Sequence, residues 1–232
     1  MQTGALSGKS ALITAACQGI GPSVAAALAA QGARVVLHAL RESSVEAVHA
    51  LVATIRGASG QASALCGDLT DPAAIATLFD EAERVVEGVG IDIVVSNAPD
   101  ALASCPLADV DLADYDRLTA LNAKARFFVL QQAGRRVRDN GCIVVTSGDE
   151  SHALEIGNAV HAGASAASEL YCRVLAKEIG ARGVTVNVVT ANPGGKPVAD
   201  LTEAADVVAF LASPEARWIT GQHIRTGVAP AA

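Results

Sequence analysis

The chain has 232 residues, 51% of them apolar, which is enough to bury one sizeable core. Its formal net charge is -7 with a pI near 5.2, and its 17 Lys and Arg residues are scattered, which argues against nucleic acid as a ligand. No stretch reaches the roughly 18 uninterrupted apolar residues of a membrane span, and the N-terminal residues lack a signal pattern, so we expect a cytoplasmic protein that does not contact a membrane.

Short apolar runs alternate with longer helical patterns along the chain. This alternation predicts a parallel sheet with right-handed crossovers between its strands. The predicted strands are 10–14, 34–38, 62–67, 91–96, 142–147, 184–190 and 222–226, and the predicted helices include 19–30, 42–55, 72–87 and 112–138. No linker or repeat interrupts the pattern, so we predict one doubly wound α/β domain over residues 1–232, with about seven strands and helices on both faces of the sheet.

The segment 72–87 shows why these helices are expected. Asp71 is placed to cap the helix, Pro72 fits its first turn, and Gly88 and Gly90 end it. Apolar residues recur on one face, at Ile75, Leu78, Phe79, Ala82 and Val86. This face predicts packing against the sheet.

The cysteines show no CxxC motif and no Cys/His spacing that would clamp a metal. They are Cys17, Cys66, Cys105, Cys142 and Cys172. We therefore expect reduced thiols that pack in the interior, and no metal site.

A glycine-containing turn, TAACQGIG at residues 14–21, connects the first predicted strand to the first predicted helix. Gly19 and Gly21 are placed so that backbone N–H groups of the turn can hold a pyrophosphate. The alternative is a tight strand-to-helix turn without a ligand, because a lone GxG is a weak signal.

Together with later segments, this turn resembles the short-chain dehydrogenase/reductase family, especially its 3-oxoacyl-carrier-protein-reductase-like members. The matching segments are QGARVV, GDLTD, SNAP, LNAKARFF and VVAFLASPEARWITGQHI, and they cover nearly the whole chain. The resemblance implies a Rossmann-type fold that uses NAD(P)(H) to reduce a carbonyl or oxidise an alcohol.

The resemblance also implies which residues contact the cofactor. They are Thr14, Gly19, Ile20, Gly21, Arg41, Asp68, Leu69, Asn97, Pro193 and Gly194. Ala15 replaces the family's first glycine, and its methyl group is expected to lower cofactor affinity because backbone freedom is wanted there. Ala39 stands where an acidic residue would bind the ribose diol, and Arg41 follows it, which favours NADP over NAD. The alternative for Arg41 is a solvated surface charge.

The family's active-site pattern, YxxSKxxxxxxxRxLAxELxxRGxxVN, aligns without a gap from His161 to Asn187. The alignment puts His161 at the family's tyrosine, Ser165 at its lysine and Gly148 at its serine. Of the four catalytic residues only the asparagine, Asn122, remains. Tyrosine titrates near 10 unaided, so the family needs the nearby lysine to make it a useful acid or base.

The candidates for proton chemistry are therefore Asn122, Ser147 and His161. An imidazole titrates near 6.5 without help, and Ser147 is one residue from the serine position. Two alternatives remain: Ser147 points to the other face of the sheet, and His161 caps or packs at the start of an interface helix. His152 is a weaker candidate on a loop, and Tyr171 is expected to pack.

Two functions remain from this reading. The first is an oxidoreductase with weak or absent ordinary turnover, because the serine, tyrosine and lysine are replaced and the segment after 184–190 leaves almost no substrate lid. The alternative is a non-catalytic nucleotide sensor or partner subunit. The substrate is a small molecule that the sequence does not identify. The resemblance further implies a homodimer or homotetramer that pairs the helix carrying LNAKARFF with the helix near His161.

Overall fold

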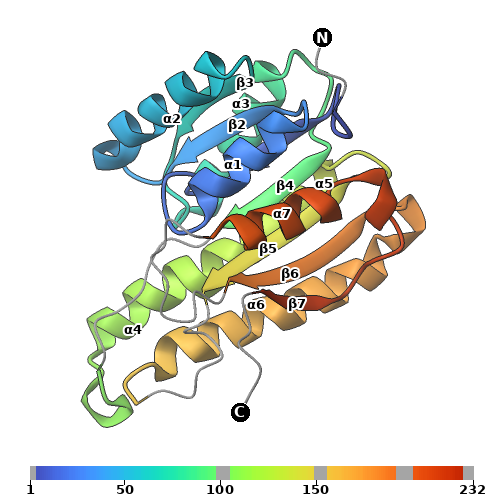
Figure 1. Cartoon of the computed structure of the whole chain (residues 1–232). Helices are drawn as coiled ribbons and strands as arrows, with labels where there is room; N and C mark the ends of the chain where they lie inside the picture. The colour runs from blue at the N-terminus through green and yellow to red at the C-terminus, as the bar shows by residue number, and fades with distance from the viewer. Residues whose placement is uncertain (1–3, 98–104, 149–155, 192–200, 227–232) are drawn as a thin grey trace.

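Seven parallel strands form the central sheet of the computed structural model, which describes residues 4–97, 105–148, 156–191 and 201–226 (Figure 1). Their order is β3-β2-β1-β4-β5-β6-β7. The strands are β1 Ser10–Ile13, β2 Arg34–Ala39, β3 Gln61–Cys66, β4 Ile93–Asn97, β5 Cys142–Gly148, β6 Thr185–Ala191 and β7 His223–Thr226. The predicted doubly wound sheet is confirmed. Its strand order reverses between β1 and β4, which is the place where this architecture binds ligands, at the carboxyl ends of the strands.

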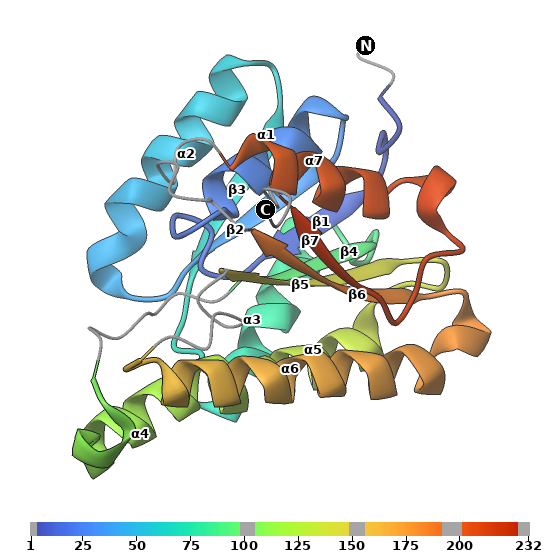
Figure 2. The same cartoon turned by 60° about the horizontal axis from the view of Figure 1, so that its bottom comes forward.

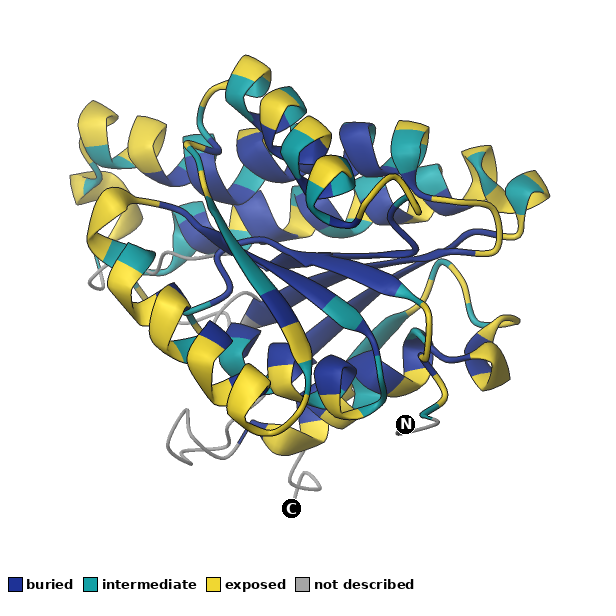
Figure 3. Ribbon diagram, turned by 90° about the horizontal axis from the view of Figure 1, so that it is seen from above, coloured by how far each residue is buried: buried dark blue, intermediate teal, exposed yellow. Residues whose placement is uncertain are grey.

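Helices cover both faces of the sheet (Figure 2). On one face lie α1 Gly21–Ala30, α2 Val45–Gly57 and α7 Thr202–Leu211, and on the other lie α3 Pro72–Val85, α5 Arg126–Arg136 and α6 Ala159–Glu178. The shorter helix α4, Leu112–Thr119, packs against α6. Successive strand residues face opposite layers, so Ile13 packs with α1 while Leu12 packs with α3. Figure 3 shows the central strands buried between the two helical layers, while the edge strands β3 and β7 are more exposed.

The predicted cap and buried face of α3 are confirmed, but the helix ends at Val85, two residues before the predicted Glu87. The Asp71 carboxylate accepts a hydrogen bond of 2.9 Å from the Ala73 N–H, and Pro72 lies in the first turn. The buried residues of the helix are Ile75, Leu78, Phe79 and Ala82.

The other predicted helices also differ from the structure. The segment predicted as 42–55 is a 3-10 turn at Glu42–Ser44 followed by α2. Helix α1 begins at Gly21 rather than Gly19, because Gly19 takes a positive φ of 53° that cannot continue into a right-handed helix. The single helix predicted for 112–138 is α4, a π-helical turn at Ala120–Ala125, and then α5, which ends at Arg136. A hydrophobic period does not reveal one turn of wider winding, and such turns are frequent at functional sites.

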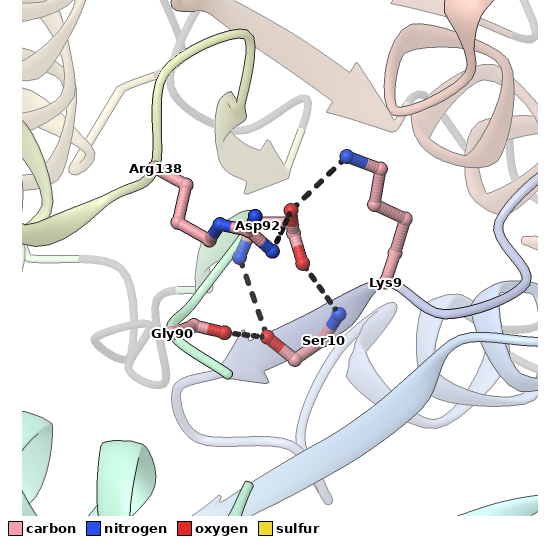
Figure 4. Close-up of polar contacts among 5 residues, drawn as sticks. All are labelled: Lys9, Ser10, Gly90, Asp92 and Arg138. Atoms are coloured by element: carbon pink, nitrogen blue, oxygen red, sulfur yellow. Dashed lines mark hydrogen bonds and ion pairs between the residues drawn. The ribbon is translucent and has the colours of Figure 1, made fainter. Parts of the chain in front are cut away.

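A buried carboxylate ties the amino ends of the central strands together (Figure 4). Asp92 is 2% exposed, and its carboxylate accepts from Lys9 Nζ at 3.0 Å and from the Ser10 N–H at 3.0 Å. The Arg138 guanidinium lies 3.5 Å from the same carboxylate, and the Ser10 hydroxyl donates to the Gly90 carbonyl. The cluster lies at the amino ends of the strands, opposite the carboxyl ends where this architecture binds ligands, so we assign it a stabilising role.

Asp92→Ala is expected to lower the free energy of unfolding by about 3 kcal/mol, because a buried N–H loses its charged acceptor. Lys9→Met serves as the control: Lys9 is 39% exposed, so its loss is expected to cost about 1 kcal/mol or less. Urea unfolding of both variants measures the difference. Equal losses of unfolding free energy in the two variants would contradict this role of Asp92, because they would show that the exposed ion pair with Lys9 supplies the stabilisation.

Candidate functional site

The turn between β1 and α1 leaves backbone N–H groups at the start of α1 without a side-chain cap. Ile20 occupies the N-cap position and makes no side-chain hydrogen bond to the helix. A Cβ added at Gly21 would lie 2.6 Å from the Ala16 carbonyl oxygen, so only glycine lets the helix approach the turn this closely. An uncapped helix start beside a close-packed turn suits a pyrophosphate.

Ala15 adopts the left-handed conformation that the glycine at this position would allow. Its φ is 46°, and its side chain is fully buried in the layer of α3 and α5. The predicted need for backbone freedom here is confirmed, and the methyl group packs into the core. The Ala15 N–H donates to Nδ1 of His38 at 3.2 Å, and the Ala16 N–H donates to the His38 carbonyl at 2.9 Å.

His38 is a site residue that the sequence analysis missed. It is fully buried in β2, and its Nε2 lies 3.0 Å from the Gly67 carbonyl oxygen. Burial lowers its pKa to about 4, against a smaller opposing effect of the Gly67 hydrogen bond. A histidine inside the apolar run RVVLH was the only signal in the sequence.

Asn97 and Thr14 shape the turn from within. The Asn97 Nδ2 donates to the carbonyls of Ala15 and Gln18, each at 2.9 Å, and its Oδ1 accepts from the Thr146 hydroxyl at 2.7 Å. The Thr14 hydroxyl accepts from the Asn97 N–H at 3.0 Å. Both side chains, predicted to contact a cofactor, have their polar atoms engaged by the protein.

An open groove lies beside the carboxyl ends of β2 and β3. It has a volume of about 510 Å³ and is lined by Leu40, Arg41, Glu42, Cys66, Gly67, Asp68, Thr70, Arg117, Ala120 and Leu121. The Asp68 carboxylate is oriented by the Thr70 N–H and hydroxyl, both at 2.8 Å, while Leu69 is buried. The groove brings together Arg41 and Asp68, which were each predicted to contact the cofactor, and it adds a second cation, Arg117, which lies too far along the chain for the sequence to place there.

Helix α6 turns its polar residues toward the sheet. Its buried positions recur every three or four residues, at His161, Ala164, Ser165, Ser168, Cys172 and Ala176. The helix packs against β5, β6 and the π-helical turn. His161 is 8% exposed and lies two residues inside a helix that begins at Ala159, so it packs inward at the start of this helix.

The other two candidates lie on the same side of the sheet. Ile143 and Val145 of β5 pack in the layer of α5 and α6, and Ser147, two residues on, points to the same face. The alternative that Ser147 points to the opposite face is therefore wrong. Asn122 is fully buried in the π-helical turn, and its carbonyl accepts from the Ser168 hydroxyl at 3.0 Å, which fixes this turn to α6.

Solved structures of other proteins share the fold of this chain. A dehydrogenase from Burkholderia cenocepacia with bound NADP superimposes with a TM-score of 0.86 at 29% identity, over 95% of this chain and 92% of the other. A short-chain dehydrogenase/reductase from Serratia marcescens has a TM-score of 0.85 at 27% identity, over 95% and 96% of the two chains.

Sequence comparison decides the family. Residues 14–200 match the family model described as enoyl-(acyl carrier protein) reductase. The chain is 34% identical to hydroxynaphthalene reductase-like protein Arp2 of Metarhizium brunneum, over 94% of this chain and 93% of that protein. This chain belongs to the short-chain dehydrogenase/reductase family. It is also 32% identical to versicolorin reductase stcU of Emericella nidulans, over 94% of each chain.

Ser165 is the residue that the sequence analysis expects at the family's lysine position. Ser165 is 2% exposed, and its hydroxyl has no hydrogen-bond partner among the described residues. Gly148 ends β5 at the serine position. Pro193, Gly194 and His152 lie outside the described residues.

A buried cation lies beneath this face. Arg126, one helical turn after Asn122, is 3% exposed and donates through Nη2 to the Thr146 carbonyl at 2.9 Å. Burial lowers its pKa to about 10, so it stays charged at neutral pH. Burial likewise raises the pKa of the Cys172 thiol to about 12 and that of Cys142 to about 11, so both remain unreactive packing thiols, as expected.

Two further groups stabilise α6 without entering the site. Glu169 lies 3.2 Å from Nδ1 of His223 on β7, whose Nε2 lies 2.7 Å from the Thr190 hydroxyl. Tyr171 packs edge-on against Phe127 with ring centroids 5.2 Å apart, as predicted. Within the described ranges there is no cluster of potential metal ligands and no helix long and apolar enough to cross a bilayer.

Proposed function

We propose that this chain binds NADP(H) and acts on a small carbonyl or alcohol with slow turnover. The observation that carries the proposal is the uncapped helix start after the turn at 14–21, together with an α6 face on which His161 and Ser165 present imidazole and hydroxyl groups in place of the family's phenol and ammonium. When bound, NADPH supplies the hydride for carbonyl reduction.

The residues present fit the nucleotide. The uncapped start of α1, with Gly19 and Gly21, would hold the pyrophosphate. Arg41 and Arg117 would hold the 2'-phosphate, since both line the groove and guanidinium groups suit phosphate oxygens. Two relatives of known structure were solved with NADP, which supports the same preference here.

His161 would exchange the proton with the substrate oxygen. An imidazole does this near neutral pH without a neighbouring cation, which fits the serine at position 165. Ser147 would orient the substrate oxygen from the facing strand, and Asn122 would hold the π-helical turn against α6. Without the lysine, a contact to the nicotinamide ribose is lost, which supports slow turnover.

A nucleotide sensor or partner subunit is the second candidate. It is favoured by Ser165, whose buried hydroxyl is too short to replace an ammonium and lacks a partner in the described part of the chain. Binding of NADPH with no oxidation by any ketone would favour this function.

Titration with NADPH and NADH, followed by nucleotide fluorescence, tests the proposal. We expect tighter binding of NADPH, and a loss of about tenfold in this preference in Arg41→Ala, because one charged hydrogen bond to the 2'-phosphate is removed. Glu42→Ala, which changes a neighbouring groove residue without removing a cation, is the control. Equal affinity for both nucleotides, or no binding of either, would refute the preference.

We also propose assembly through α5 and α6. Their outer face exposes Phe127, Leu170 and Val174, and it includes a groove lined by Arg135 and Glu178. A two-fold axis through this face would pack these apolar side chains against those of a second protomer. It would also bring Arg135 of one protomer near Glu178 of the other.

Val174→Asp is expected to lower the molar mass in light scattering by at least half, because the axis would bury two unpaired carboxylates. Val89→Asp, on the loop after α3, is the control and should leave the mass unchanged. A monomeric parent chain would remove the proposed assembly.

A further inference from the structure

A single buried imidazole connects the two halves of the nucleotide site. His38 Nε2 lies 3.0 Å from the Gly67 carbonyl oxygen, which can only accept, so Nε2 carries the proton. Nδ1 is then the acceptor, and it receives the Ala15 N–H at 3.2 Å. Ala15 belongs to the pyrophosphate turn, and Gly67 lines the groove beside Asp68. One tautomer of one side chain therefore satisfies both contacts.

The turn needs such support because the left-handed backbone conformation of Ala15 is unfavourable for alanine. A left-handed backbone is unfavourable for any residue with a Cβ, and Ala15 holds a φ of 46°. Its N–H is bound by the His38 ring, and the next N–H is bound by the His38 carbonyl at 2.9 Å. Without the ring, Ala15 would be free to relax to a negative φ and the turn would change shape.

We propose that His38 is a positioning residue that holds the turn at 14–21 in its pyrophosphate-binding conformation and fixes it relative to the groove lined by Arg41 and Asp68. The inference rests on the proposed function for the identity of the ligand. The imidazole thereby compensates for the absence of glycine at position 15. It does not touch the nucleotide itself, because it is fully buried in β2.

A double-mutant cycle tests the coupling. His38→Leu is expected to weaken NADPH binding about tenfold, since it orphans the Ala15 N–H and releases the turn. In a chain that also carries Ala15→Gly, the same change is expected to weaken binding less than about threefold, because glycine keeps the positive φ without help. His38→Asn, whose amide oxygen can take the place of Nδ1, is expected to recover part of the affinity. Equal losses in the parent background and in the Ala15→Gly background would overturn the proposal.

Amide hydrogen exchange of the nucleotide-free protein gives a second readout that does not depend on the ligand. We expect the Ala15 amide to exchange at least about tenfold faster in His38→Leu than in the parent chain, and to stay protected in His38→Asn. An unchanged exchange rate in His38→Leu would overturn the proposal even where NADPH binds. If the parent chain binds no NADPH, the proposed function fails, and the exchange experiment still decides the role of His38.

Discussion

Restoring the family's residues in the chain, with Gly148→Ser, His161→Tyr and Ser165→Lys together, is expected to raise the rate of NADPH-dependent ketone reduction by at least about 100-fold. A general acid matched to its task contributes about 10²–10⁴-fold, and a tyrosine reaches a useful pKa only beside a cation. The rest of the arrangement is present: position 161 faces the sheet, Ser147 marks the facing strand end, and Asn122 is held against α6.

The matched control carries Gly148→Ser, His161→Phe and Ser165→Met. It has nearly the same side-chain volumes without the phenol and the ammonium, and it also lacks the imidazole of His161, so its rate is expected to fall below the parent level. NADPH affinity and thermal stability, measured on all three proteins, separate lost chemistry from lost folding. If the control gains as much as the restored variant, shape rather than proton transfer limits the parent chain.

Acid is expected to destabilise the protein through His38. Its pKa is about 4 in the folded chain against an ordinary value of 6.5, so the unfolded chain takes up a proton first as the pH falls. The stability contributed by the neutral ring is complete above pH 6.5 and is lost as the pH falls from 6.5 to about 4. A difference of this size corresponds to a loss on the order of 3 kcal/mol.

Denaturant unfolding between pH 7 and pH 4 measures this effect against His38→Asn. Carboxylates contribute to acid sensitivity in both proteins, so the difference between the two curves isolates the histidine. We expect the advantage of the parent chain at pH 7 to shrink across this range. Parallel curves would show that His38 does not titrate with a lowered pKa.

The fold could be predicted from the sequence because its signals are local. The run SALIT, the turn at 14–21 and the apolar face of 72–87 each appear within a few residues, and the structure places β1, the turn and α3 accordingly. The placement of His161 near the start of a helix could also be predicted, from the gapless alignment that runs from His161 to Asn187.

The contacts that shape the site could not be predicted, because they join distant segments. His38 meets Ala15 across 23 positions and Gly67 across 29, so neither partner is visible from RVVLH alone. Arg117 of α4 lines the same groove as Asp68, although no local pattern connects these two segments of the chain. Both faces of β5 are apolar, with Val144 packed in one layer and Val145 in the other, so the sequence does not show which layer Ser147 faces.

NADPH oxidation by the parent chain and by His161→Ala, followed over a panel of ketones from pH 5 to pH 9, tests whether His161 transfers the proton to the substrate oxygen. We expect both proteins to bind NADPH and the parent chain to turn over slowly. We also expect the rate of the parent chain to fall as the pH rises through the range near 6.5, where imidazoles titrate. In His161→Ala, we expect the rate to be lost. A fast parent rate that His161→Ala leaves unchanged would contradict the assignment of proton transfer to this side chain.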